Sequence, residues 1–139
     1  MTSTRQAQLP TSAIEIVRCI YDAIEDGDTR TPRNYFREDV EAYVSEFVPW
    51  GGSFKGLDAF GEGFLTMTRY VRIAFEPSEL IDAGDHVIAL GRSVGIVHRT
   101  GQAFSVRTVH IWKIEDEQVT SVAYYHDLEL ARHLADAAA

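Results

Sequence analysis

The hydrophobic period of the chain changes near residue 70, and this change constrains the fold more than any other feature of the sequence. Before it, apolar residues recur every three to four positions, as in amphipathic helices. After it, apolar and polar residues alternate through four long runs, as in strands that bury one face. Helices followed by a strand meander predict an α+β domain, with helices covering one face of a curved, mostly antiparallel sheet.

The first helix has a clear start in the sequence. Ser12 and Glu15 have the spacing of a capping box, and the apolar positions that follow keep helical spacing as far as Gly27. A short second helix is predicted after it, because Thr31 can serve as its N-cap and Pro32 suits its first turn.

Strands and turns account for most of the remaining chain. A first strand is predicted over 40–47, and a glycine-rich loop then leads to a third helix over 57–70. The later strands are predicted at 71–82, 86–98, 103–114 and 118–126, with a short C-terminal helix over 128–137.

Length and charge limit the class of protein. The chain has 139 residues, so we expect a flexible arm over 1–11 and a single domain over 12–139. The net charge of −8 argues against a nucleic-acid partner, which requires clustered Lys and Arg. No run approaches the ~20 apolar residues of a membrane span, and no signal peptide is recognised. Cys19 is the only cysteine and has apolar neighbours, so we expect a buried thiol and a cytoplasmic location.

Strand pairing determines which side chains face the helices. We predict a two-residue turn at 100–101 in one hairpin and pairing of Ile114 with Val119 in the next. The face beneath the helices then carries small residues opposite polar and aromatic ones: Gly91, Ser93, Gly95, Thr108, His110, Trp112, Ala123, Tyr125 and Asp127. Small residues there leave room for a cavity. The other face is largely aliphatic, which predicts a homodimer through the outer face of the sheet. A β-bulge would exchange the two faces.

The order of elements resembles the NTF2-like superfamily, and more closely its SnoaL-like and ketosteroid-isomerase-like branch. The resemblance spans roughly residues 12–134 and rests on the segments "YDAIEDGD", "YFREDVEAYV", "WGGSFKGLDAFGEGF" and "VHIWKIEDEQVTSVAYYHD". It implies a cone-shaped domain with three N-terminal helices packed on a curved sheet and a short C-terminal helix. The fold hosts isomerases, cyclases, epoxide hydrolases and non-enzymes, so it implies a reaction less specifically.

The resemblance also implies acid–base positions. Asp127 matches the aspartate that ends the last strand and faces the cavity in polyketide cyclases and limonene-type epoxide hydrolases. His110 stands where the steroid isomerases have a protonated aspartate that donates a hydrogen bond to the oxyanion. Their general base aligns with Val44, and Glu46, two residues further along the same face, could substitute for it.

Two family features are incomplete in this chain. The first-helix tyrosine of the steroid isomerases aligns near Ile20, with Tyr21 adjacent. The epoxide hydrolases carry Arg-x-Asp on a middle strand, whereas "GRSVG" has Arg92 without the aspartate. The chain therefore departs from both strict patterns.

Each candidate also has a purely structural interpretation. Asp127 can cap the last helix through its side-chain oxygen. His110 lies in the interior of a strand, where a lone histidine is often a hydrogen-bonded core residue. Glu46 can be a solvated residue at a strand end.

The sequence predicts a cofactor-independent acid–base enzyme of the isomerase or cyclase type. Its substrate would be a small, largely apolar organic molecule with a carbonyl group. Asp127 would move the proton, His110 would polarise the oxygen, and Glu46 would be the reserve base. The alternatives are a non-catalytic binding or scaffolding protein and an epoxide hydrolase. No metal spacing is present among the histidines, so no metal or cofactor is expected. The predicted substrate-binding residues are Tyr21, Val44, Trp50, Phe64, Met67, Trp112 and Tyr125.

Overall fold

The helices begin where local capping chemistry predicts them. The computed structural model describes residues 12–138, so the predicted arm at 1–11 lies outside the described residues. Ser12 Oγ accepts a hydrogen bond from Glu15 N at 3.3 Å, and the Glu15 carboxylate accepts one from Ser12 N at 3.0 Å. This capping box starts the first helix, as expected. None of the described helices is long and apolar enough to cross a membrane.

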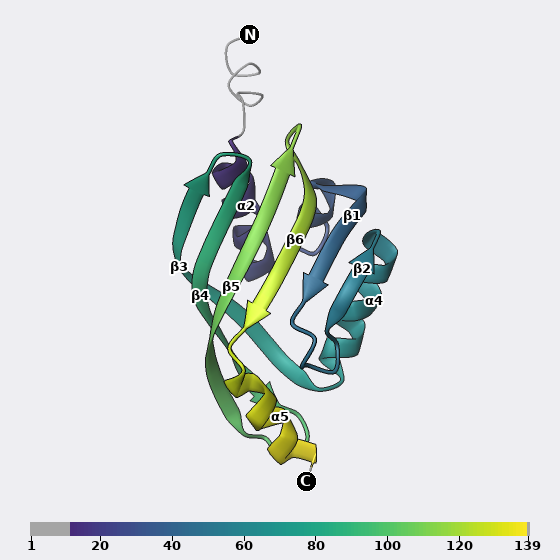
Figure 1. Cartoon of the computed structure of the whole chain (residues 1–139), viewed down its shortest axis with the longest axis vertical. Helices are drawn as coiled ribbons and strands as arrows, with labels where there is room; N and C mark the ends of the chain where they lie inside the picture. Colours follow the sequence, from purple (N-terminus) through teal and green to yellow (C-terminus); the bar gives the residue numbers. More distant parts are fainter. Residues whose placement is uncertain (1–11, 139) are drawn as a thin grey trace.

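Helices and strands are interspersed in the first half of the chain, and four consecutive strands and a last helix make up the second half (Figure 1). In chain order they are α2 (Ala13–Glu25), α3 (Thr31–Asn34), β1 (Phe36–Val44), β2 (Gly52–Lys55), α4 (Leu57–Thr68), β3 (Val71–Ala83), β4 (His86–Val97), β5 (Ala103–Glu115), β6 (Gln118–His126) and α5 (Glu129–Ala138). The short strand β2 lies in the segment predicted to be a glycine-rich loop.

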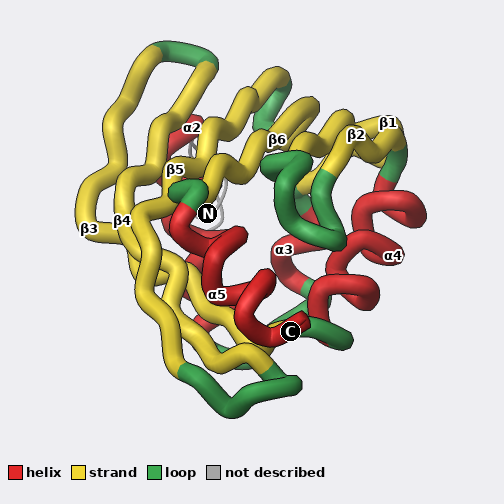
Figure 2. Tube along the Cα trace, turned by 60° about the horizontal axis from the view of Figure 1, so that its bottom comes forward, coloured by secondary structure: helices red, strands yellow, loops and turns green. Residues whose placement is uncertain are grey.

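The six strands form one curved sheet in the order β2-β1-β6-β5-β4-β3. Neighbouring strands are antiparallel except β1 and β6, which are parallel. The strands curve around the helices on one side of the sheet (Figure 2). The predicted α+β cone with a mostly antiparallel sheet is therefore confirmed.

Two groups of buried side chains hold the helices on the sheet. Ile16, Val17 and Ile20 of α2 are fully buried in the first group, which also contains residues of β1, β4, β5 and β6. Leu130 of α5 is fully buried in the second group, with Phe104 and other residues at the opposite end of the sheet. Each such side chain contributes about 1.5–3 kcal/mol by burial, so these contacts fix both helices.

Cys19 is exposed, so the prediction of a buried thiol is wrong. The buried arc of α2 runs through Ile16, Ile20 and Ala23. At 100° per residue, Cys19 lies just beyond the edge of that arc. Apolar neighbours in the sequence therefore did not make it a core position.

The β4–β5 hairpin has the predicted faces but not the predicted turn. His110 pairs with Ala89 rather than with Gly91, because the turn contains the four residues 98–101 instead of two. The register is shifted by two residues, which preserves the direction of every side chain. The inward direction of His110 is thus confirmed.

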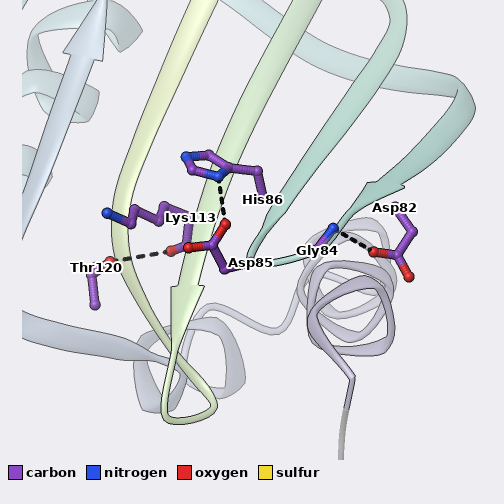
Figure 3. A network of polar contacts seen from close by, with 6 residues as sticks. All are labelled: Asp82, Gly84, Asp85, His86, Lys113 and Thr120. Carbon is purple, nitrogen blue, oxygen red and sulfur yellow. Dashed lines mark hydrogen bonds and ion pairs between the residues drawn. The ribbon is translucent and has the colours of Figure 1, made fainter.

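The predicted register of β6 is wrong beyond Thr120, where the strand contains a β-bulge. Ile114 pairs with Val119 as predicted, but the next pair is Lys113 with Ser121. Thr120 is the extra residue, and its hydroxyl donates to the carbonyl oxygen of Lys113 at 3.5 Å (Figure 3). One extra residue reverses the direction of all side chains that follow it.

The bulge exchanges the two faces of β6. Tyr124 and His126, predicted on the outer face, line the interior beneath the helices. Ala123 and Tyr125, predicted to face inward, lie on the outer face, where Tyr125 is 44% exposed. Asp127, one residue beyond the strand, is exposed as well.

The glycines of β4 accommodate the backbone of β3 rather than a cavity. A Cβ atom on Gly95 would lie 2.0 Å from the carbonyl oxygen of Arg72, and one on Gly91 would lie 2.2 Å from that of Glu76. Both distances are far below van der Waals contact. The prediction that these glycines leave room for a ligand is wrong, because the neighbouring strand fills the space.

Replacing Gly95 by alanine should lower the free energy of unfolding by about 1–3 kcal/mol, the usual cost of overpacking. Gly61 is the matched control, since it lies inside α4 and a Cβ atom there would meet nothing within 4 Å. Gly61→Ala should therefore stabilise the protein by about 0.5–1 kcal/mol. Urea unfolding of the two variants measures both effects, and equal stability of Gly95→Ala and wild type would contradict the close approach of β3.

Candidate functional site

A cavity of about 550 Å³ lies between α2, α4 and the inner face of the sheet. Ligand pockets usually have volumes of about 300–1,000 Å³, so a small organic molecule fits. The cavity wall is predominantly aromatic and apolar. It includes six of the seven predicted substrate-binding residues, namely Tyr21, Val44, Trp50, Phe64, Met67 and Trp112, and also His110.

His110 occupies the middle of the cavity wall, on β5. Its ring lies between those of Phe75 and Tyr124, with centroid distances of 3.9 Å and 4.1 Å. Only 7% of the residue is exposed. Its Nδ1 lies 2.7 Å from the hydroxyl oxygen of Tyr21, which accepts a hydrogen bond from Trp112 Nε1 at 2.8 Å.

The second ring nitrogen of His110 is Nε2. No atom of residues 12–138 forms a hydrogen bond with it. In the same part of the chain, no buried side-chain nitrogen or oxygen lacks a partner. Nε2 is therefore accessible from the cavity, and it is a polar atom in an otherwise apolar wall.

A second polar group lies further along β5 and β6. Thr108 Oγ1 donates to Ser93 Oγ at 2.7 Å and lies 3.2 Å from Nδ1 of His126. Ser93 and Thr108 are buried, and Ser93 and His126 line the cavity. The backbone N of His126 donates to Ser45 Oγ at 3.0 Å, which holds the end of the strand in place.

Both histidines of the cavity are neutral near pH 7. Burial, with a smaller contribution from His126, lowers the pKa of His110 well below its ordinary value. Burial lowers the pKa of His126 to about 4. Burial also raises the pKa values of Tyr21 and Tyr124, so both hydroxyls keep their protons.

The acidic residues of the cavity lie at its mouth. Asp22, Glu25 and Glu76 are exposed, and no Lys or Arg is among the lining residues. Among residues 12–138, no three His, Cys, Asp or Glu side chains are placed to hold a metal ion.

Three predicted site residues lie outside the cavity. Asp127 is exposed, and its Oδ1 accepts a hydrogen bond from Glu129 N at 2.9 Å, which supports the capping interpretation. Glu46 is exposed in the turn that follows β1, because this strand ends at Val44 and not at 47. Tyr125 lies on the outer face. The structure therefore does not bring either carboxylate to His110.

Tyr124 and His126 are the cavity residues of β6 that sequence reasoning missed, and Phe75 of β3, which packs on His110, was not predicted either. The signal was the spacing of Val119 and Val122, which are three apart and both buried. Strict alternation cannot bury both, so the pair indicates an extra residue between them. Thr120 is that residue.

The fold and the cavity define an NTF2-like protein. An NTF2-like protein from Burkholderia thailandensis superposes with a TM-score of 0.82 at 24% identity, over 89% of this chain and 97% of that chain. Residues 17–122 match the SnoaL-like domain, and the chain belongs to this family. The resemblance seen in the sequence is confirmed.

Two further solved structures carry small molecules. TerC, co-crystallised with polyporic acid, has a TM-score of 0.78 and 22% identity, over 89% of this chain and 98% of that chain. A protein from Catenulispora acidiphila with a ketosteroid isomerase-like fold, in complex with trimethylamine, has a TM-score of 0.69 and 18% identity, over 82% and 86%. At these identities the likeness shows the fold alone. No match was found among the curated proteins.

Acidification from pH 7 to pH 5 should destabilise the protein, because the folded state keeps the two cavity histidines neutral. An unfolded histidine takes up a proton near pH 6.5, whereas the folded protein holds both side chains neutral to a lower pH. The resulting stability is therefore complete above pH 6.5 and is lost as the pH falls, toward about 4 for His126. The slope is at most about 1.4 kcal/mol per pH unit for each histidine. Urea unfolding across this range measures it.

His126→Gln should reduce this slope, whereas His98→Gln, at an exposed turn position, should leave it unchanged. Carboxylates titrate mainly below about pH 4.5 and so add little in this window. An unchanged slope in His126→Gln would show that His126 does not stay neutral in the folded protein.

Proposed function

We propose that the protein binds a small, uncharged, largely apolar carbonyl compound in the cavity, and that His110 polarises the carbonyl oxygen. The observation that carries this proposal is the unpartnered Nε2 of His110 in an aromatic wall. A neutral imidazole can donate a hydrogen bond from this atom to an oxygen. Donors placed in advance in a site of low dielectric are most effective where negative charge develops, as on an enolate.

The reaction we propose is a cofactor-independent proton transfer of the isomerase or cyclase type. Thr108 Oγ1 donates to Ser93, so it can accept the Nδ1–H of His126 and leave Nε2 of His126 as a proton acceptor. His110 and His126 are diagonal neighbours across β5 and β6, which places the two residues about 7–8 Å apart, with their Cβ atoms somewhat closer. One small molecule can span them. A proton taken from the carbon beside the carbonyl and returned to another carbon needs no further reactant.

The charges of the site argue against an anionic ligand. No Lys or Arg lines the cavity to pair with a carboxylate or phosphate, and the carboxylates at the mouth repel anions. The polyporic acid and trimethylamine complexes show that relatives of this fold accommodate small organic molecules.

A non-catalytic ligand-binding role is the second candidate. It is favoured by the exposed positions of Asp127 and Glu46, which leave the deep part of the cavity without a carboxylate base. Epoxide hydrolysis has less support, because the Arg92 guanidinium hydrogen-bonds to Ser105 and is exposed.

A matched pair of probes tests the binding proposal. The ketone 1-tetralone should bind about fivefold more tightly than the hydrocarbon tetralin, the value of one ordinary hydrogen bond. His110→Phe should remove this preference, and His98→Phe should keep it. Calorimetric titration measures both ligands on the three proteins, and an equal preference in His110→Phe would contradict the assignment of His110.

Deuterium exchange distinguishes the enzyme from the binding protein. In D₂O, the proposed enzyme should exchange the hydrogens beside the carbonyl of bound 1-tetralone faster than buffer does. His126→Gln should lose this exchange while retaining affinity for the ketone. Binding without exchange in the wild-type protein would support the non-catalytic candidate.

We also propose that the outer face of the sheet forms a homodimer interface. Tyr43 and Tyr125 pack together there with tilted rings whose centroids are 5.5 Å apart, and Ile96 is 41% exposed on the same face. The two tyrosines line a groove of about 460 Å³ that also includes Ile111 and Ala123, and Ile96 lies further along the same face. Exposed apolar surface of this kind often marks an interface between proteins.

Sedimentation should show a particle with twice the mass of one chain. Tyr125→Glu should shift it toward the monomer, because a charge would be buried in the interface. Leu65→Glu is the control, since Leu65 is 68% exposed on α4, away from this face. A monomeric wild-type protein would contradict the proposed dimer.

A further inference from the structure

Three side chains form a hydrogen-bonded chain that ends at the cavity. Trp112 and His110 are two residues apart on the inner face of β5, and Tyr21 of α2 bridges them. The distances are 2.8 Å from Trp112 Nε1 to the Tyr21 oxygen and 2.7 Å from that oxygen to His110 Nδ1. Trp112 is 1% exposed and His110 7%, whereas Tyr21 is partly buried and lines the cavity.

The chemistry of the three groups orients the chain. An indole N–H can only donate, so the Tyr21 oxygen is the acceptor at that end. A phenol has a single hydrogen, and burial raises the pKa of Tyr21, so the hydrogen stays on the oxygen. The remaining partner of that hydrogen is Nδ1 of His110, which must then be unprotonated. A neutral imidazole with a bare Nδ1 carries its hydrogen on Nε2.

The opposite arrangement leaves a hydrogen without an acceptor. If His110 donated from Nδ1, the Tyr21 oxygen would accept two hydrogen bonds. Within residues 12–138, the Tyr21 hydroxyl has no third partner that could receive its own hydrogen. An unpaired hydroxyl in an aromatic environment disfavours that state by about tenfold or more.

We propose that Trp112 is a positioning residue that, through Tyr21, fixes the hydrogen of His110 on Nε2, so that the cavity selects ligands by an acceptor oxygen and rejects donors at that point. The inference rests on the proposed function for its ligand class. Its tautomer, however, is a property of the protein alone. Trp112 never contacts the reacting atoms in this scheme and acts only through Tyr21.

Long-range ¹H–¹⁵N correlation spectra of ¹⁵N-labelled protein near neutral pH identify the tautomer of His110 directly. The wild-type protein should show the Nε2–H form. Trp112→Phe should shift the population toward the Nδ1–H form, because Tyr21 is then free to accept from Nδ1. Trp50→Phe is the control, since Trp50 lines the cavity and is buried but does not hydrogen-bond to Tyr21.

The wild-type spectrum tests whether His110 carries its hydrogen on Nε2 even if Trp112→Phe fails to fold. Tyr21→Phe is a second variant that removes the link without emptying the indole site, and it should also release the Nε2–H preference. An Nδ1–H form in the wild type, or an unchanged Nε2–H form in both variants, would overturn the inference.

Binding of the two probes separates this inference from the proposed function. Trp112→Phe should reduce the preference for 1-tetralone over tetralin by about fivefold, in step with the tautomer. If the tautomer responds but neither His110→Phe nor Trp112→Phe changes ketone preference, the proposed ligand class fails and the positioning role stands. If the preference for the ketone depends on His110 but the tautomer of His110 does not change in Trp112→Phe, the proposed ligand class stands and the positioning role of Trp112 fails.

Discussion

The β-bulge at Thr120 is the constraint on which the cavity depends. Val119, near the start of β6, is buried beneath the helices. The extra residue, Thr120, then turns the side chains of Val122, Tyr124 and His126 toward the helices as well. Without it, this strand would contribute Ala123 and Tyr125 to the cavity wall. The bulge therefore determines which alternate side chains of β6 line the cavity. It does so without changing the order of the strands.

The polar groups of the cavity are held from two directions. Residues of β5 supply His110, Trp112 and Thr108 at alternate positions, all facing inward because the register of β4 and β5 keeps its parity. Helix α2 then adds Tyr21, one position from the fully buried Ile20 that anchors the helix. Packing of an apolar stripe thus sets the geometry of a hydrogen-bonded group.

Local patterns predicted the elements and the fold well, because capping residues and hydrophobic periods act over a few positions. They also predicted His110 and Trp112 in the cavity, since a turn error of two residues preserves parity. They failed for Asp127, whose direction depends on a single inserted residue, Thr120, seven positions before it. They failed for Gly91 and Gly95, because the approach of β3 is a contact between distant segments. Parity errors are all-or-none, so one missed bulge misplaced a whole strand end.

The two uncharged imidazoles have a consequence for solution conditions. The deep part of the cavity contains no formal charge near neutral pH, because burial keeps both rings in the neutral form. Dissolved ions screen the attraction between charges, and this screening does not act on contacts among neutral groups. The occupancy of the cavity by a neutral guest would therefore follow the abundance of that guest and would not be reduced by charge screening.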